Sequence, residues 1–136
     1  MTNPTFINKL NEDLKLEYAA AIQYIQHAAM LTGVHFAFVD ELLSHADDEI
    51  RHAKKLNDHI QFLGGVPIVS VGPVYTSNQA ASMLSQDLSG EETAVVRYKE
   101  RINEAMAEGL FGTVAVLLGI LKDEEEHLND IRSIIE

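Results

Sequence analysis

The chain has 136 residues, 46% of them hydrophobic and 23% charged, which is enough to bury a core and fold as one domain over residues 1–136. Ten basic residues against 21 acidic ones leave a net charge of −11, which repels phosphate backbones and anionic membranes, so we expect no nucleic acid and no membrane as partner. Because there is no cysteine, disulfides, thiolate metal sites and thiol nucleophiles are excluded.

The first residues are polar and lack the basic and apolar regions of a signal peptide. The longest apolar stretch, residues 114–121, is too short to cross a bilayer. We therefore expect a cytoplasmic protein.

Apolar residues recur every three or four positions in four long segments, and this periodicity predicts four helices. The first is predicted over residues 5–31 and stops at Gly33. The second is predicted over residues 36–63 and stops at the pair Gly64 and Gly65.

Ser77 or Asn78 is the predicted N-cap of a third helix, which ends near Ala107. Thr113 is the predicted N-cap of a fourth helix, which ends near Ile135.

The connections between these helices have different lengths. The first and the third are short, which favours antiparallel hairpins. The middle one, residues 64–76, could reach roughly 43 Å when extended, whereas a 27-residue helix is about 40 Å long. The sequence therefore predicts an all-α four-helix bundle of two antiparallel hairpins joined by a long crossover.

Each predicted helix carries one glutamate among its inward apolar positions. These acids are Glu17, Glu49, Glu91 and Glu124, and they lie at similar distances from the predicted helix starts. Aligned helices would bring all four together near the middle of the bundle. Because a desolvated carboxylate costs several kcal/mol unless it is paired or neutralised, a cation must join them.

His52 and His127 follow two of these acids at a spacing of three, which puts each histidine on the same helix face as its glutamate. Six such donors are enough for two metal ions with shared carboxylates and open positions. Four carboxylates and two Fe(II) ions also balance to zero charge, and these donors suit iron or manganese, with zinc as a substitute. The predicted metal ligands and catalytic residues are Glu17, Glu49, His52, Glu91, Glu124 and His127.

The two hairpins repeat further residues around these acids. Tyr24 and Tyr98 lie seven positions after Glu17 and Glu91, and we expect their phenols to hydrogen-bond the carboxylates of the site. Asp48 and Asp123 directly precede the two Glu-x-x-His motifs. We expect Asp123 to support His52 and Asp48 to support His127 across the bundle.

The other histidines are assigned no role in the site. We expect His27 to be a partly buried helix residue, and His35, His45 and His59 to be exposed or interface residues.

Three segments carry a family resemblance: residues 16–24 (LEYAAAIQY), 48–53 (DEIRHA) and 120–127 (ILKDEEEH). They resemble the ferritin-like di-iron carboxylate superfamily, and bacterioferritins in particular, over essentially the whole chain. The resemblance implies a ferritin-like bundle and oxidation of Fe(II) by dioxygen or peroxide, usually followed by iron storage. It also implies a homo-oligomer, at least a dimer.

The resemblance implies a role for each of the six site residues. Glu17 and His52 would bind one iron, and Glu91 and His127 the other. Glu49 and Glu124 would bridge the two ions.

Two departures from bacterioferritins limit this resemblance. The position of their haem-ligating methionine holds Ile50, so we expect no haem. The chain ends at Glu136, just after the fourth predicted helix, so the short fifth helix that helps close the family's cage has no counterpart and a cage is not implied.

Two other functions stay open at this point. A rubrerythrin-like peroxidase would share the bundle and the ligands, but it would carry a further ligand glutamate where this chain has Ala94, and a cysteine-rich domain. A non-enzymatic helical assembly protein would keep a metal for stability alone.

Overall fold

The computed structural model describes residues 2–136, and these residues form helices and no strand. The helices are α1 (Pro4–Met30), η1 (Gly33–Phe38), α2 (Val39–Phe62), α3 (Ala80–Ala107) and α4 (Phe111–Ile135). The prediction of an all-α protein with four long helices is confirmed, and each predicted helix end lies within three residues of the observed one.

Local sequence signals explain several helix ends. Pro4 opens α1, and the side chain of Asn3 accepts a hydrogen bond of 2.8 Å from the backbone N–H of Thr5. Gly64 ends α2 with φ of 91°, and Gly109 ends α3 with φ of 72°. Both glycines adopt the left-handed conformation of a Schellman motif, in which two backbone N–H groups bond back to the last helical turn.

The first predicted helix start differs from the observed one by a single residue, and the other three differ for identifiable reasons. Residues 36–38 belong to the short helix η1, so α2 begins at Val39. The N-cap of α3 is Gln79, and Ser77 accepts a hydrogen bond from its backbone N–H. Thr113 is not the N-cap of α4, because the helix begins at Phe111 with Leu110 as its N-cap. Thr113 is buried in the first turn, with its hydroxyl 2.6 Å from His59 Nε2.

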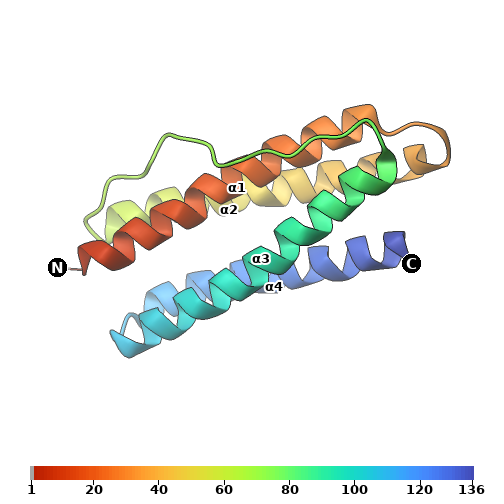
Figure 1. Cartoon of the computed structure of the whole chain (residues 1–136). Coiled ribbons are helices and arrows are strands. Elements are labelled where there is room, and N and C mark those ends of the chain that lie inside the picture. The colour runs from red at the N-terminus through yellow and green to blue at the C-terminus, as the bar shows by residue number, and fades with distance from the viewer. Residues whose placement is uncertain (1) are drawn as a thin grey trace.

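The four long helices form two antiparallel hairpins, α1 with α2 and α3 with α4 (Figure 1). The hairpins pack against each other through α1 with α3 and α2 with α4. The crossover between α2 and α3 runs along α1 from one end of the bundle to the other (Figure 1). The predicted arrangement of two hairpins and a long crossover is confirmed.

The crossover is tied to α1 at three heights. The Asn11 side chain bonds the backbone of Val66 and Ile68, at 3.1 and 2.8 Å. Further along, the N–H of Gly72 donates to the carbonyl of Lys15 (3.1 Å), and the N–H of Tyr75 donates to Gln23 Oε1 (2.9 Å). These bonds satisfy backbone groups that a segment without regular structure would otherwise leave to water.

Two hydrophobic clusters fill the bundle. One contains Leu10, Leu14 and Leu56, and the other contains Leu42 and Met83. Along each long helix, the buried glutamate lies between residues of the first cluster and residues of the second. The apolar core is therefore interrupted by polar side chains near mid-height. Over residues 2–136, no helix combines the length and apolarity that crossing a membrane requires.

Candidate metal centre

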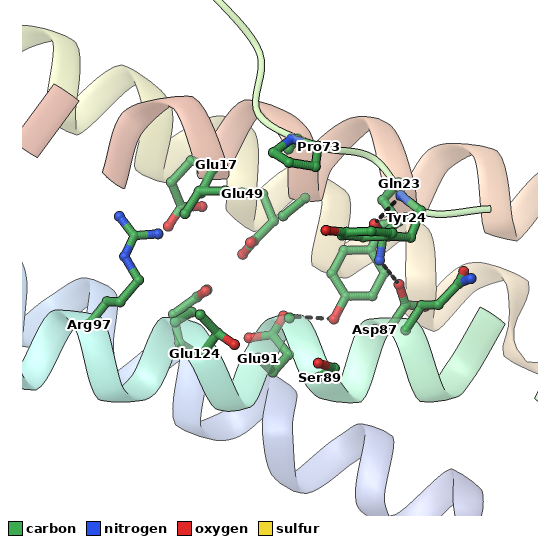
Figure 2. A pocket seen from close by; sticks show the side chains of 18 of the residues that line it. Glu17, Gln23, Tyr24, Glu49, Pro73, Asp87, Ser89, Glu91, Arg97 and Glu124 are labelled. Carbon is green, nitrogen blue, oxygen red and sulfur yellow. Dashed lines mark hydrogen bonds between the residues drawn. The ribbon is translucent and has the colours of Figure 1, made fainter. Parts of the chain in front are cut away.

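The structure brings all six predicted ligands together in the middle of the bundle. One residue comes from α1, two from α2, one from α3 and two from α4, and none is more than 3% exposed. Figure 2 shows the four carboxylates pointing toward one another. The six residues are Glu17, Glu49, His52, Glu91, Glu124 and His127.

The six side chains form two overlapping groups. Donor atoms of Glu17, Glu49, His52 and Glu124 all lie within 4.8 Å of one another. Donor atoms of Glu49, Glu91, Glu124 and His127 do so as well. Glu49 and Glu124 belong to both groups, so the arrangement has two halves that share two carboxylates.

Each histidine directs one ring nitrogen into its group. His52 Nδ1 lies 3.5 Å from Glu17 Oε2 and 3.3 Å from Glu124 Oε1. His127 Nδ1 lies 3.3 Å from an oxygen of Glu49 and 3.3 Å from one of Glu91. The Nδ1 atoms of both rings are therefore the nitrogens that face the carboxylates.

The opposite ring nitrogens donate to the two aspartates expected there. His52 Nε2 bonds Asp123 Oδ2 at 2.8 Å, and His127 Nε2 bonds Asp48 Oδ2 at 2.8 Å. Arg51, which the sequence analysis did not identify, joins both aspartates at 2.8 and 3.0 Å.

These contacts set the charge of the aspartates and the tautomer of the histidines. Burial works against ionisation of the aspartates, but the hydrogen bonds from the histidines and from Arg51 outweigh it and hold the pKa of Asp48 and Asp123 below their usual value. The ionised aspartates in turn keep the proton on Nε2 of each ring.

Tyr24 and Tyr98 each hydrogen-bond one carboxylate of the cluster. Tyr24 of α1 donates to Glu91 of α3 at 2.7 Å, and Tyr98 of α3 donates to Glu17 of α1 at 2.6 Å. Burial and the neighbouring carboxylates raise the pKa of both phenols well above their usual value, so both stay protonated donors. Each tyrosine therefore ties one hairpin to the other.

The crowding of carboxylates shifts their proton affinity. Burial and the charges of Glu17, Glu124 and Glu91 raise the pKa of Glu49 well above its usual value. Burial and the charges of Glu17 and Glu91 raise the pKa of Glu124 to about 8. Without a bound cation, the cluster therefore retains protons at neutral pH.

The two histidines are shifted in the same direction. Burial disfavours the imidazolium of His127, but Glu91 and Glu124 outweigh burial and raise its pKa to about 10. For His52 burial is likewise outweighed, here by Glu124, Glu17 and Glu49, and its pKa lies far above the usual value. Protons thus occupy positions that a metal ion would take.

Unpaired donor atoms test whether a metal ion fits this cluster. Five buried donor or acceptor atoms of the six-residue cluster have no hydrogen-bond partner within the described chain. Buried polar atoms of this kind are rare because each loses its hydration without compensation. Carboxylate oxygens with one imidazole in each half are donors that iron or manganese accepts, so the residues fit a pair of such ions. The unpaired atoms are Glu17 Oε2, Glu49 Oε1, His52 Nδ1, Glu91 Oε2 and Glu124 Oε1.

A cavity of about 480 Å³ leads to the cluster between α1 and α3. Pro73 of the crossover lies over it, and Arg97 and Asp87 lie on either side of the carboxylates (Figure 2). Its wall also includes small apolar residues such as Ala20 and Ala94.

Two buried aspartates beside the cluster were missed in the sequence analysis. Asp13 is 1% exposed and accepts hydrogen bonds from Arg97 and, at 2.8 Å, from Arg101 Nε. Asp87 is 2% exposed and accepts from Gln23 at 2.9 Å. A signal was present, because each aspartate lies four residues before a core glutamate, in matching positions of the two hairpins.

His27 is fully buried, whereas partial burial was expected. Its Nδ1 lies 3.0 Å from Asp87 Oδ2, and its Nε2 lies 2.9 Å from the carbonyl oxygen of Tyr75. Since both partners are acceptors, both ring nitrogens donate, and the hydrogen bond to Asp87 raises the pKa of His27 against the opposing effect of burial. This imidazolium links α1, α3 and the crossover.

The expectation that His45 is an exposed or interface residue is wrong. Its side chain is 3% exposed, and its ring stacks on that of His127 with 4.0 Å between centroids. His45 lies four residues before Glu49, so it occupies the same inward face of α2. His35 and His59 are half-buried.

Comparison with known proteins agrees with this geometry. The sequence model of the Ferritin family, described as a ferritin-like domain, matches residues 7–136. A bacterioferritin of Mycobacterium bovis is 29% identical, over 98% of this chain and 86% of its own length. A bacterioferritin of Mycobacterium leprae is 32% identical, over 93% of this chain and 81% of its own length. A bacterial non-heme ferritin of Escherichia coli is 24% identical, over 100% of this chain and 84% of its own length.

Among solved structures, a ferritin-like di-iron carboxylate protein of Bacillus anthracis superposes with a TM-score of 0.95. The two sequences are 28% identical, and the match covers 100% of both chains. On this match of sequence and fold, the chain belongs to the ferritin-like domain family, with bacterioferritins among its relatives.

Proposed function

We propose that this protein is a di-iron ferroxidase, which oxidises Fe(II) to Fe(III) with dioxygen or peroxide in iron detoxification or storage. The observation that carries the proposal is the pair of overlapping donor groups sharing Glu49 and Glu124. Such sharing suits two ions side by side, and a centre for a single ion would not need it.

In this proposal the six residues divide between the ions. Glu17 and His52 would hold one Fe(II), Glu91 and His127 would hold the other, and Glu49 and Glu124 would bridge them. The overlap of the two groups supports this division. Manganese or zinc would fit the same donors as substitutes.

The pair of ions accounts for the charge and the redox balance of the site. Four carboxylates neutralise two Fe(II) ions, so the loaded centre can stay buried. Two Fe(II) ions give up two electrons when both become Fe(III). With two protons these electrons reduce one dioxygen to hydrogen peroxide, so a site for two ions suits a two-electron oxidant.

The protein's own groups orient the ligands and keep the site dry. Asp123 and Asp48 hold a proton on Nε2 of His52 and His127, which leaves each Nδ1 free to coordinate. Tyr24 and Tyr98 fix one oxygen each of Glu91 and Glu17. The two apolar clusters above and below exclude water from those two sides of the centre and leave the cavity between α1 and α3 as the approach.

We further propose that the protein forms a homo-oligomer and binds no haem. Large apolar side chains are exposed on α1 and the crossover, among them Ile22, Ile25 and Val69, and a partner subunit would cover them. Ile50 stands next to Glu49 and offers no donor atom to a haem iron.

Anaerobic Fe(II) titration followed by exposure to oxygen tests the activity. A ferroxidase binds about two Fe(II) per chain, oxidises them rapidly and accepts further Fe(II) in repeated cycles. A site kept only for stability binds once and stays inert, and that result would overturn the proposal. The Glu125→Gln variant, with its change on the exposed face of α4, is the matched control and should behave like the wild type.

A further inference from the structure

A second group of metal-binding side chains lies outside the six-residue cluster. It consists of Glu41 and His45 of α2 and Asp130 of α4. One imidazole nitrogen and one oxygen of each carboxylate lie within 4.8 Å of one another.

Helix periodicity places this group directly beside the centre. Glu41, His45 and Glu49 follow one another at intervals of four on α2, so they share one face. Asp130 follows His127 by three residues on α4 and shares its face. The group therefore extends both ligand-bearing faces by one helical turn, toward the bundle end that holds the C-terminus (Figure 1).

Burial distinguishes the histidine from the two carboxylates. The His45 side chain is 3% exposed, and the only hydrogen-bond partner of its ring among residues 2–136 is Asp130 of the same group, on Nε2. Asp130 is 42% exposed and its Oδ2 lies 3.1 Å from His45 Nε2, while Glu41 is half-buried. One strong donor thus lies inside the protein and two charged donors lie at its surface, where solvent can deliver an ion.

The negative charge of this group is not balanced by other side chains. Within the described part of the chain, the only ion pair of Asp130 is with His45, and Glu41 forms none. A 3.1 Å separation of His45 Nε2 and Asp130 Oδ2 also suits two neighbouring ligands on one ion, because bonds of about 2.1 Å at right angles put donors about 3 Å apart.

We propose that Glu41, His45 and Asp130 bind a third divalent transition-metal ion, such as Fe(II), Mn(II) or Co(II). One imidazole and two carboxylates suit these ions, and water would complete the coordination on the exposed side. His45 stacks on His127 at 4.0 Å, so this ion would lie beside the buried pair and in contact with solvent. The binding of this ion does not depend on the proposed function, whereas a role in supplying Fe(II) to the buried pair rests on it.

Co(II) binding measured by equilibrium dialysis tests the site. The test variant is Glu41→Gln with Asp130→Asn, which keeps both shapes and removes both charges while leaving His45 in place. The control is Asp40→Asn with Glu125→Gln, which removes one exposed acid from each of the same helices. We expect three Co(II) per chain in the wild type and the control, and two in the test variant.

Other stoichiometries separate the two proposals. One Co(II) in the wild type and none in the test variant would support the third site and contradict the buried pair. Equal stoichiometry in the wild type and the test variant, at two or at three, would overturn the third site.

Anomalous scattering from crystals grown with Co(II) gives a second readout. We expect a peak at a coordination distance of about 2.1 Å from a ring nitrogen of His45 and near Asp130, in addition to the peaks between the six central residues. Peaks confined to the six central residues would contradict the proposal.

Discussion

The four buried glutamates have unequal surroundings. Glu17 and Glu91 each accept a hydrogen bond from a tyrosine of the opposite hairpin. Glu49 and Glu124 have no tyrosine partner among the described residues, although all four glutamates keep one unpaired oxygen. This difference suits a division into two carboxylates that each hold one ion and two that bridge.

Replacing Glu49 or Glu124 with Ala should abolish Fe(II) oxidation, because in the proposed centre either change would remove a ligand from both ions. Replacing Glu17 or Glu91 with Ala should weaken the binding of mainly one ion and leave residual oxidation activity. Stopped-flow oxidation rates and anaerobic Fe(II) stoichiometry measure both effects. Glu92→Ala, on the exposed side of α3, is the control, and equal mild losses from all four core replacements would contradict the bridging assignment.

Asp48→Asn should lower the affinity for one of the two ions by roughly 10- to 100-fold. The reason is that the amide no longer stabilises the proton on Nε2 of His127 as an ionised carboxylate does. Co(II) affinity measured by calorimetry reports this loss. The neighbouring Asp47 is exposed, so Asp47→Asn should leave the affinity unchanged. A similar loss in both variants would show that the effect is one of overall charge.

Sequence reasoning identified side chains whose proximity to one another follows from helical spacing. The six central residues and the two aspartates behind the histidines share faces that the spacing of three and four predicts, and the structure brings them together. Asp13, Asp87 and His45 were missed because each lies one turn outside the central layer. Their burial depends on partners from other helices, namely Arg101, His27 and the ring of His127.

At the scale of the elements, the helix C-termini at glycine were predictable from the sequence. The helix N-termini that follow a short turn or a 3-10 helix were not. Gly64 and Gly109 end their helices because their positive φ suits no other residue as well. The Schellman turn at Gly109 leaves only Leu110 before α4, so the helix starts before Thr113. The 3-10 helix η1 buries none of its residues and shows no apolar periodicity.

Gly109→Ala should destabilise the apo-protein by about 1 kcal/mol, because alanine is strained at φ of 72°. Gly119→Ala should have the opposite sign, stabilising by about 1 kcal/mol, because Gly119 lies inside α4 and a Cβ there meets no other atom within 4 Å. Denaturation midpoints of the two variants and the wild type test this. Equal shifts of one sign would contradict the assignment of Gly109 as the end of α3.

At the scale of the whole molecule, the length of the middle connection was sufficient to predict the topology. A connection able to span a helix favoured two hairpins over a simple up-and-down bundle, and the crossover does run along α1 (Figure 1). Its attachment could not be predicted, because it depends on the backbone positions of Gly72 and Tyr75 relative to Lys15 and Gln23.

Metal binding should release protons and should tighten as pH rises. Without metal, Glu124 with a pKa of about 8 and His127 with a pKa of about 10 are both protonated at pH 7, and the ions need the deprotonated forms. Lowering the pH from 8 to 6 should therefore weaken Co(II) binding. Calorimetry in buffers of different ionisation enthalpy counts the released protons, and a count of zero at pH 7 would contradict the prediction.

The buried acids should also link metal binding to the stability of the bundle. Without metal, four carboxyl groups face two imidazolium ions, and this excess of acids is offset only by the protons that the raised pKa values keep on Glu49 and Glu124. Replacing Glu17 and Glu91 together with Gln removes that excess and keeps the side-chain volume and an oxygen for each tyrosine. The double variant should therefore unfold at a higher temperature than the wild type when both lack metal.

Iron should reverse this order. Binding to the folded state alone stabilises by RT ln(1 + [L]/Kd), which is about 4 kcal/mol at a thousand-fold excess over Kd. The wild type should gain most of this, and the double variant should gain much less because each ion has lost a carboxylate. Thermal scans with and without Fe(II) under anaerobic conditions measure both effects. If the double replacement changed neither the apo melting temperature nor the rise with iron, the two glutamates would not be ligands, and the dinuclear centre would be the wrong account of these buried acids.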